Sequence, residues 1–128
     1  MTPTTHIHFV EKQTQEYDGT PTTSIDMLLG TDQLGWTECR FYNDRFGDWQ
    51  SRWHIGHTEI RSNYRRQGYG EQLLKEVCQR LWAKHRVPVT VDPVPQDPSI
   101  SKEALEKFYT KCGFEKTGPG TRMRCFPT

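Results

Sequence analysis

The segment Asn63-Tyr64-Arg65-Arg66-Gln67-Gly68-Tyr69-Gly70 joins an alternating, β-prone run to an amphipathic helical pattern. Gly68 and Gly70 allow the backbone to approach a ligand closely, and the free N–H groups of a first helical turn favour an anion there. Arg65 and Arg66 add cationic hydrogen-bond donors beside those groups. The segment therefore predicts a site for an anion such as a pyrophosphate. The alternative is an ordinary glycine-containing turn with two solvated arginines, which would have the same sequence.

A helix is predicted directly after this turn, from Tyr69 to His85, because apolar residues recur at helical spacing. Lys84, His85 and Arg86 suit the negative end of a helix dipole, and Pro88 prevents continuation. The apolar positions are Leu73, Leu74, Val77, Cys78, Leu81 and Trp82.

Four strands are predicted before the turn. They run from His6 to Lys12, Ser24 to Leu29, Leu34 to Tyr42 and Trp49 to Ile60, with turns predicted at Gly30 to Gln33 and at Asn43 to Asp48. Gln13 to Thr23 is predicted to be a loop. In the fourth strand, alternation predicts Trp53, Ile55, His57 and Glu59 on one side, and His54, Gly56, Thr58 and Ile60 on the other.

After the helix, Val87, Val89 and Val91 predict a short strand, and the proline-rich segment Asp92 to Ile100 a stiff connection. A second helix begins near its N-cap Ser101 and stops at Gly113. A terminal hairpin follows, from Phe114 to Thr117 and Thr121 to Phe126, turning at Gly118-Pro119-Gly120. This order predicts one domain over residues 1–128, an α/β fold whose mixed sheet has helices on its faces.

Composition excludes several classes. The net charge of +1 argues against nucleic acid as a partner, and no run approaches the about 20 apolar residues of a membrane span. Met1 to Thr5 does not begin a signal peptide, which makes a reducing cytoplasm the expected location. The cysteines, of which Cys78 and Cys112 lie on apolar helix faces, form no CxxC pair, so no metal is expected.

The glycine turn lacks the Gly-Lys-Ser/Thr ending of a P-loop and the three glycines of the dinucleotide fingerprint. It resembles the acyl-CoA motif of the Gcn5-related N-acetyltransferase (GNAT) family, Gln/Arg-x-x-Gly-x-Gly/Ala, as Arg65-x-x-Gly68-x-Gly70. The segment Ala104 to Phe114 is similar to the later helix of that family, which ends in Tyr-x-x-x-Gly-Phe, here Tyr109, Gly113 and Phe114. Two motifs in the right order are more specific than either alone.

The resemblance implies a central sheet of about six to seven strands and acetyl-CoA as co-substrate. Family members place two helices between the first and second strands, but Gln13 to Thr23 leaves room only for a turn or loop. The helical pair is therefore expected to be reduced or missing, which suggests an open face for the amine acceptor and favours a protein or other bulky acceptor. A monomer or homodimer is expected.

The resemblance also implies site residues. Tyr109 matches the tyrosine that protonates the departing thiolate, while its position also suits the apolar face of the helix. The general base is a carboxylate, Glu59 or Asp92, with His54 and His57 as rivals. The fourth strand is expected to splay from the fifth near Ile60 and Arg61. The expected cofactor-binding residues are Ile60, Arg61, Arg65, Arg66, Gln67, Gly68, Tyr69, Gly70 and Ser101.

Ser101 and Lys102 occupy the place where the family often has an asparagine, so one cofactor contact is expected to be lost. Trp36, Trp49 and Trp53 are candidates for lining the acceptor site, although tryptophans near strands more often belong to the core.

Two other functions remain open. One is a CoA-binding sensor or interaction module without turnover. The other is a small nucleic-acid-associated protein that uses Arg61, Arg65, Arg66, Arg122 and Arg124.

Overall fold

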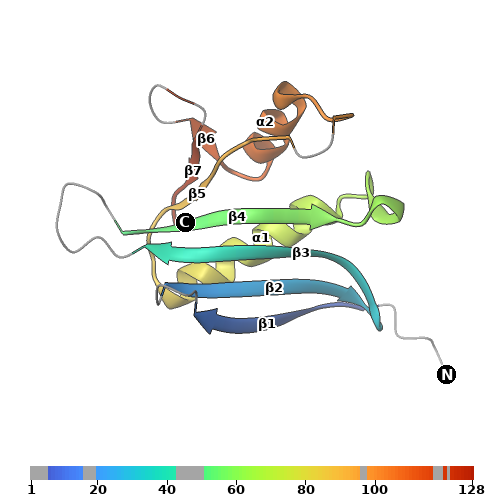
Figure 1. Cartoon of the computed structure of the whole chain (residues 1–128), viewed down its shortest axis with the longest axis horizontal. Helices are drawn as coiled ribbons and strands as arrows, with labels where there is room; N and C mark the ends of the chain where they lie inside the picture. The colour runs from blue at the N-terminus through green and yellow to red at the C-terminus, as the bar shows by residue number, and fades with distance from the viewer. Residues whose placement is uncertain (1–5, 16–19, 43–50, 96–97, 117–119, 121) are drawn as a thin grey trace.

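The computed structural model contains a seven-stranded mixed sheet with two α-helices (Figure 1), and it describes residues 6–15, 20–42, 51–95, 98–116, 120 and 122–128. The strand order is β1-β2-β3-β4-β5-β7-β6, and only β4 and β5 pair in parallel. The strands are β1 Ile7–Gln15, β2 Pro21–Leu29, β3 Asp32–Tyr42, β4 Arg52–Ile60, β5 Val89–Val91, β6 Glu115–Lys116 and β7 Met123–Cys125. The helices are η1 Ser62–Tyr64, a 3-10 turn, α1 Tyr69–Lys84 and α2 Lys102–Lys111. The predicted α/β class and strand number are confirmed.

The first hairpin is longer than predicted. β1 and β2 pair continuously from Ile7 opposite Leu29 to Gln15 opposite Pro21, so the loop predicted at Gln13 to Thr23 is wrong at both ends. Threonine suits a pleated strand, and Pro21 is tolerated because it stands first in its strand. Only residues 16–20 connect the two strands, which is too short for a helical pair.

The second hairpin is confirmed, but its turn is shorter than predicted. Gly30 adopts φ 62°, and Asp32 already pairs with Leu29, so the connection is Gly30-Thr31 rather than four residues. The turns predicted at 43–48 and 118–120, and Trp49, lie wholly or largely outside the described residues.

A β-bulge at Gly56 changes which side chains share a face of β4. Ile55 lies opposite Cys39 and His57 opposite Glu38, so Gly56 is an extra residue that strict alternation does not anticipate. Thr58 consequently lies on the same face as the buried Thr37, whose hydroxyl it contacts at 3.4 Å. The predicted faces are therefore wrong beyond the bulge, because His57 and Glu59 share the side of His54.

The core lies between α1 and one face of the sheet. The predicted helix is confirmed, and it buries Leu73, Leu74, Val77, Cys78 and Leu81. The Trp53 indole N–H donates to the carbonyls of Leu81 (3.1 Å) and His85 (3.2 Å), which satisfies carbonyls at the C-terminal end of the helix. Trp53 is thus a core residue and does not line an acceptor site. The four cysteines are buried and form no disulfide with one another. None of the described helices is long and apolar enough to cross a membrane.

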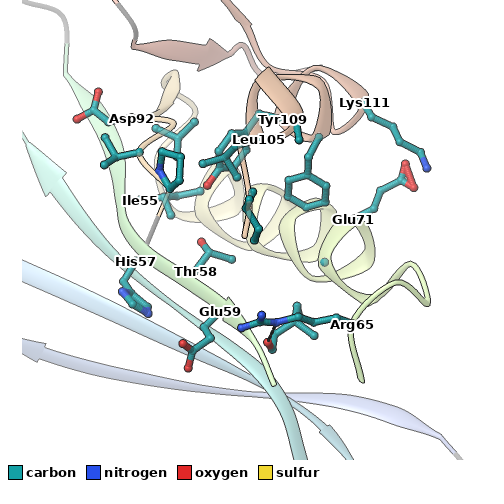
Figure 2. A pocket seen from close by; sticks show the side chains of 18 of the residues that line it. Ile55, His57, Thr58, Glu59, Arg65, Glu71, Asp92, Leu105, Tyr109 and Lys111 are labelled. Carbon is teal, nitrogen blue, oxygen red and sulfur yellow. Dashed lines mark hydrogen bonds between the residues drawn. The ribbon is translucent and has the colours of Figure 1, made fainter. Parts of the chain in front are cut away.

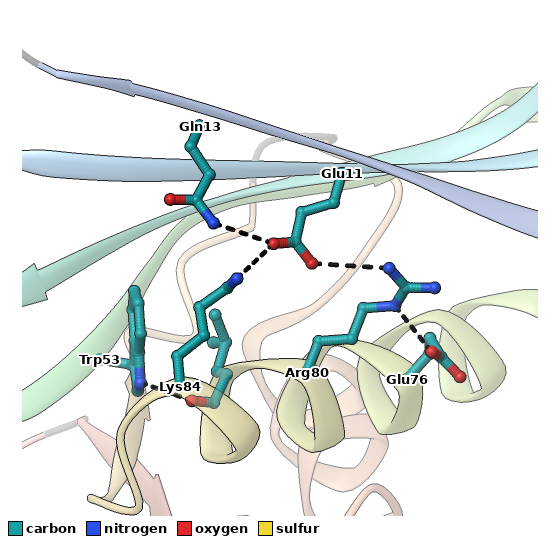
Figure 3. Close-up of polar contacts among 7 residues, drawn as sticks. Glu11, Gln13, Trp53, Glu76, Arg80 and Lys84 are labelled. Atoms are coloured by element: carbon teal, nitrogen blue, oxygen red, sulfur yellow. Dashed lines mark hydrogen bonds and ion pairs between the residues drawn. The ribbon is translucent and has the colours of Figure 1, made fainter.

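An ion-pair network fixes α1 to β1 (Figure 3). The Glu11 carboxylate contacts Lys84 at 2.5 Å and Arg80 at 3.5 Å, and Arg80 also bonds Glu76 at 2.7 Å. Burial raises the pKa of the Glu11 carboxyl, but hydrogen bonds from Lys84, Gln13 and Arg80 and the charge of Lys84 outweigh it, so its pKa lies below the ordinary value. Glu11 therefore stabilises the fold in its ionised form.

We expect Glu11→Gln to lower the free energy of unfolding by about 1–2 kcal/mol at pH 7, because charged hydrogen bonds to Lys84 and Arg80 are lost. A lowered folded pKa stabilises the protein above the unfolded value, so the difference should shrink as the pH falls below about 4.3. Urea unfolding at several pH values measures this, with the exposed Glu115→Gln as control. A pH-independent difference would contradict the assigned role of the Glu11 charge.

Candidate functional site

The candidate site lies where β4 and β5 separate. Their parallel pairing ends at Ile55 opposite Val91, and β4 continues to Ile60 with no β5 partner. The expected divergence of the two strands is thereby confirmed. A cavity of about 790 Å³ occupies the gap, within the size range of small-molecule sites. Figure 2 shows it bounded by β4, the loop before α1, the segment after β5, and α2.

The glycine turn forms one end of this cavity. Gly68 is the N-cap of α1 with φ 82°, and no side chain caps the helix. The first bond within the helix runs from the N–H of Gln72 to the carbonyl of Gly68, at 3.2 Å, so the preceding N–H groups remain available. A Cβ on Gly68 would meet nothing within 4 Å, whereas one on Gly70 would lie 3.0 Å from the Phe108 ring. Gly68 keeps the turn accessible, and Gly70 allows α1 and α2 to approach.

The arginines of the turn have different roles. The Arg65 Nε donates to the carbonyl of Ile60 at 2.9 Å, which ties the loop to the end of β4. Arg66 adopts φ 66° and is exposed at the cavity wall. Successive left- and right-handed residues turn backbone N–H groups toward one point, an arrangement that binds anions. Arg61 bonds the Gln33 side-chain oxygen at 2.8 Å instead of lining the cavity.

Five of the predicted cofactor-binding residues line the cavity: Ile60, Arg65, Arg66, Gly68 and Gly70. Four do not: Arg61, Gln67, Tyr69 and Ser101. The Ser101 hydroxyl caps α2 by accepting from the N–H of Ala104 at 3.1 Å, which confirms its predicted N-cap role.

Tyr109 projects from α2 into the same cavity (Figure 2). It is 7% exposed, and its hydroxyl has no hydrogen-bond partner among the described residues. Burial raises its pKa to about 12, so the phenol remains protonated at neutral pH. A hydroxyl at a cavity wall that makes no hydrogen bond to the described residues is available to donate to a bound ligand.

The Asp92 carboxylate is held by Arg122. Arg122 donates two hydrogen bonds to it, at 2.9 and 3.2 Å, and these outweigh burial and hold its pKa below the ordinary value. His54 Nε2 lies 3.6 Å from Asp92, while its Nδ1 contacts the Thr90 hydroxyl at 2.8 Å. That hydroxyl donates to the Trp53 carbonyl, so Nδ1 carries the proton. Burial lowers the pKa of His54, although the charge of Asp92 opposes this.

Glu59 and His57 lie at the rim of the cavity. Figure 2 shows both projecting to one side of β4, with Thr58 on the other. Glu59 is exposed and has no ion-pair or hydrogen-bond partner among the described residues. The His57 ring stacks on Trp36, with centroids 4.3 Å apart and planes 14° apart. The four candidate bases therefore lie on or near the same sheet face, opposite the helices.

Several lining residues were not anticipated from the sequence. Leu105 and Phe108 line the cavity beside Tyr109, and their spacing from Tyr109 on the helix could have identified them. Some others lack a sequence signal because they depend on the separation of β4 and β5: Thr58, Tyr64, Glu71, Val91 and Lys111. The part of the chain that the structure describes holds no group of three or more potential metal ligands.

Comparisons with known proteins agree with this geometry. A family model described as an acetyltransferase (GNAT) domain matches residues 28–116. No curated protein sequence matches. The solved structure of the anti-CRISPR protein AcrVA5 is 28% identical, with a TM-score of 0.59 over 79% of this chain and 96% of its own.

Two further structures share the fold. AtaTR bound with acetyl-CoA is 18% identical, with a TM-score of 0.64 over 84% of this chain and 68% of its own. The NatC complex bound to Gag peptide and CoA is 16% identical, with a TM-score of 0.60 over 82% of this chain and 70% of the matched one.

Removal of the Arg122 side chain should release Asp92. We expect the pKa of Asp92 to rise toward its ordinary value in Arg122→Gln, because hydrogen bonds from Arg122 are the largest cause of its lowering. Carboxyl NMR titration measures the shift, and Arg124→Gln, which removes another arginine of the same segment, is the control. An unchanged Asp92 pKa would show that this ion pair does not form in solution.

Proposed function

The chain belongs to the GNAT acetyltransferase family, and we propose that it transfers the acetyl group of acetyl-CoA to a primary amine by direct attack on the thioester. The observation that supports this most strongly is the gap between β4 and β5, which opens onto the uncapped N-terminus of α1. The amine nitrogen forms a bond to the acetyl carbon while the carbon–sulfur bond breaks, and its electron pair goes to sulfur.

For the donor, we assign the pyrophosphate to the glycine turn. The N-terminal N–H groups of α1 and the Arg65 and Arg66 side chains supply hydrogen-bond donors and positive charge there. The pantetheine arm would lie along the unpaired edge of β4 from Gly56 to Ile60, where free backbone groups pair with its amides. The acetyl-CoA found in the AtaTR structure is consistent with such a donor.

For the base, we favour Glu59 over Asp92. A lysine amine with a pKa near 10.4 is neutral in about one molecule per thousand at neutral pH, which costs roughly 4 kcal/mol. A base that accepts the amine proton, directly or through water, offsets part of this cost. Asp92 is a weaker candidate because two hydrogen bonds from Arg122 occupy its carboxylate. Glu59 has no such partner among the described residues and lies at the cavity rim.

We assign Tyr109 as the group that assists departure of the CoA thiolate. It lies on the helix side of the gap, whereas the carboxylates lie on the opposite face, so the acetyl carbon would lie between acid and base. Complete proton transfer from a phenol of pKa about 12 to a thiolate whose thiol has an ordinary pKa of about 8.5 is unfavourable by about 3.5 pKa units. Tyr109 therefore acts first as a hydrogen-bond donor to the sulfur as its negative charge develops.

For the acceptor, we favour an amine on a protein. Five residues connect β1 to β2, so that connection cannot supply a helical wall over the acceptor side. In Figure 1, neither described helix lies over the front of β1 to β4. The peptide bound to the NatC complex shows that a chain with this fold works in an assembly that accommodates a polypeptide.

The donor site is tested by Gly68→Asp, with Gly68→Asn as matched control. Both side chains tolerate the left-handed conformation of Gly68, but only aspartate adds negative charge beside the pyrophosphate. We expect acetyl-CoA to bind Gly68→Asp at least about tenfold more weakly than Gly68→Asn, by Coulomb repulsion at a partly solvated site. Calorimetric titration measures both affinities. No acetyl-CoA binding by the folded wild type would refute the proposed function.

The proton roles are tested by Tyr109→Phe and Glu59→Gln, using CoA release with lysine-containing peptides. We expect each to lower kcat by about 100-fold at neutral pH with acetyl-CoA affinity nearly unchanged. The Glu59→Gln defect should shrink as the pH approaches the amine pKa near 10.4, since the amine then loses its proton unaided. A defect of constant size would exclude Glu59 as the base. Acetyl-CoA binding without any turnover would indicate a CoA-binding sensor instead.

A further inference from the structure

A group of five side chains combines negative charge with half-buried aromatic rings on the sheet face away from α1. Asp26, Trp36 and Glu59 lie opposite one another across β2, β3 and β4, and Glu38 lies opposite His57 in the neighbouring pair. Because the Trp36 and His57 rings stack, the two rows are in contact. We call Asp26, Trp36, Glu38, His57 and Glu59 the acidic aromatic patch.

The carboxylates of this patch are mostly uncompensated. Glu38 and Glu59 have no ion-pair or hydrogen-bond partner among the described residues, and Asp26 accepts one hydrogen bond from Gln33, at 3.2 Å. Arg61 is linked to Asp26 only indirectly, because it bonds the oxygen of the same Gln33 side chain. Three carboxylates around an aromatic stack favour a cation, which gains from both the charges and the ring faces.

The β-bulge at Gly56 makes this patch continuous with the cavity. It turns His57 and Glu59 onto the patch face, and both residues also line the cavity rim. An amine that enters the gap from this face therefore has Trp36 and Glu38 beside it. Further along the same face the charge reverses, because Arg40 and Arg52 belong to the next rows, while Lys12 ends the row of Glu38 and His57 on the far side of Ser24. The negative half is thus the half next to the reacting position.

We propose that the patch binds a basic peptide segment of the acceptor protein, which presents a lysine to the cavity and a second cation to the Trp36–His57 stack. This proposal rests on the proposed function and adds the sequence preference of the acceptor. An extended peptide is the favoured occupant because the surface lies on an open sheet face. Pockets for small ligands usually bury most of the ligand, and no described helix covers this face, so a small polyamine is a weaker candidate.

The test uses a fluorescent Gly/Ser peptide with one central lysine and an arginine on each side, and a matched peptide with glutamine in place of arginine. Anisotropy without acetyl-CoA measures binding alone, and CoA release measures kcat/KM. We expect the wild type to prefer the arginine peptide by about five- to tenfold in both, with the preference weakening at high salt. Glu38→Gln and Trp36→Ala should each reduce it to about twofold or less. Arg52→Gln, on the other half of the face, should retain it.

The outcomes separate this proposal from the proposed function. A wild type that binds acetyl-CoA and acetylates both peptides equally would overturn the basic-segment proposal and leave the acetyltransferase intact. Equal binding of the two peptides would overturn it even without turnover. Acetylation of spermidine with a higher kcat/KM than the arginine peptide, and no effect of Trp36→Ala, would also overturn it by identifying a polyamine acceptor. Unchanged acetyl-CoA affinity in Glu38→Gln would show that its defect does not arise at the donor site.

Discussion

The separation of β4 from β5 beyond Ile55 is the constraint on which the rest of the site depends. Up to that pair the two strands share hydrogen bonds, and beyond it one edge of β4 is left without a strand partner. Backbone N–H and C=O groups that are buried from water need hydrogen-bond partners, so the gap is suited to a ligand that supplies amide groups. The uncapped N-terminus of α1 and the Tyr109 hydroxyl face the same gap, so three unsatisfied polar features converge on one cavity.

Sequence patterns predicted the elements that depend on local chemistry. The helical period of α1, the N-cap Ser101 and the glycine turn all depend on near neighbours in the chain, and the structure contains each of them. The bulge at Gly56 was missed because an extra residue in one strand is defined only by its pairing with the next. The same limit applies to Asp92. Its partner Arg122 is distant in sequence, so the sequence did not indicate that the carboxylate accepts hydrogen bonds from an arginine.

The short connection between β1 and β2 changes the balance of the two sheet faces. One face is covered by α1 and contains the apolar core, and the other displays polar and aromatic side chains over β1 to β4. Members of the family usually cover the second face with a helical pair between the first two strands. In this chain that connection is only five residues long, whereas the β4 gap and the glycine turn on the proposed donor side are present. In the proposed function, donor recognition is local to α1 and β4, whereas acceptor recognition is a property of an open surface.

The position of β1 at the edge of the sheet gives Glu11 a further consequence. A nine-residue edge strand presents free N–H and C=O groups that could template pairing with another molecule, which is the first step of aggregation. Glu11 points inward from this strand, and among the described residues its carboxylate contacts Lys84 and Arg80 of α1 and Gln13. A one-residue slip of β1 would turn that carboxylate to the other face of the sheet, away from Lys84 and Arg80, and lose their hydrogen bonds. The ionised Glu11 that holds α1 on the sheet thus also fixes the register of an edge strand that could otherwise pair with another molecule.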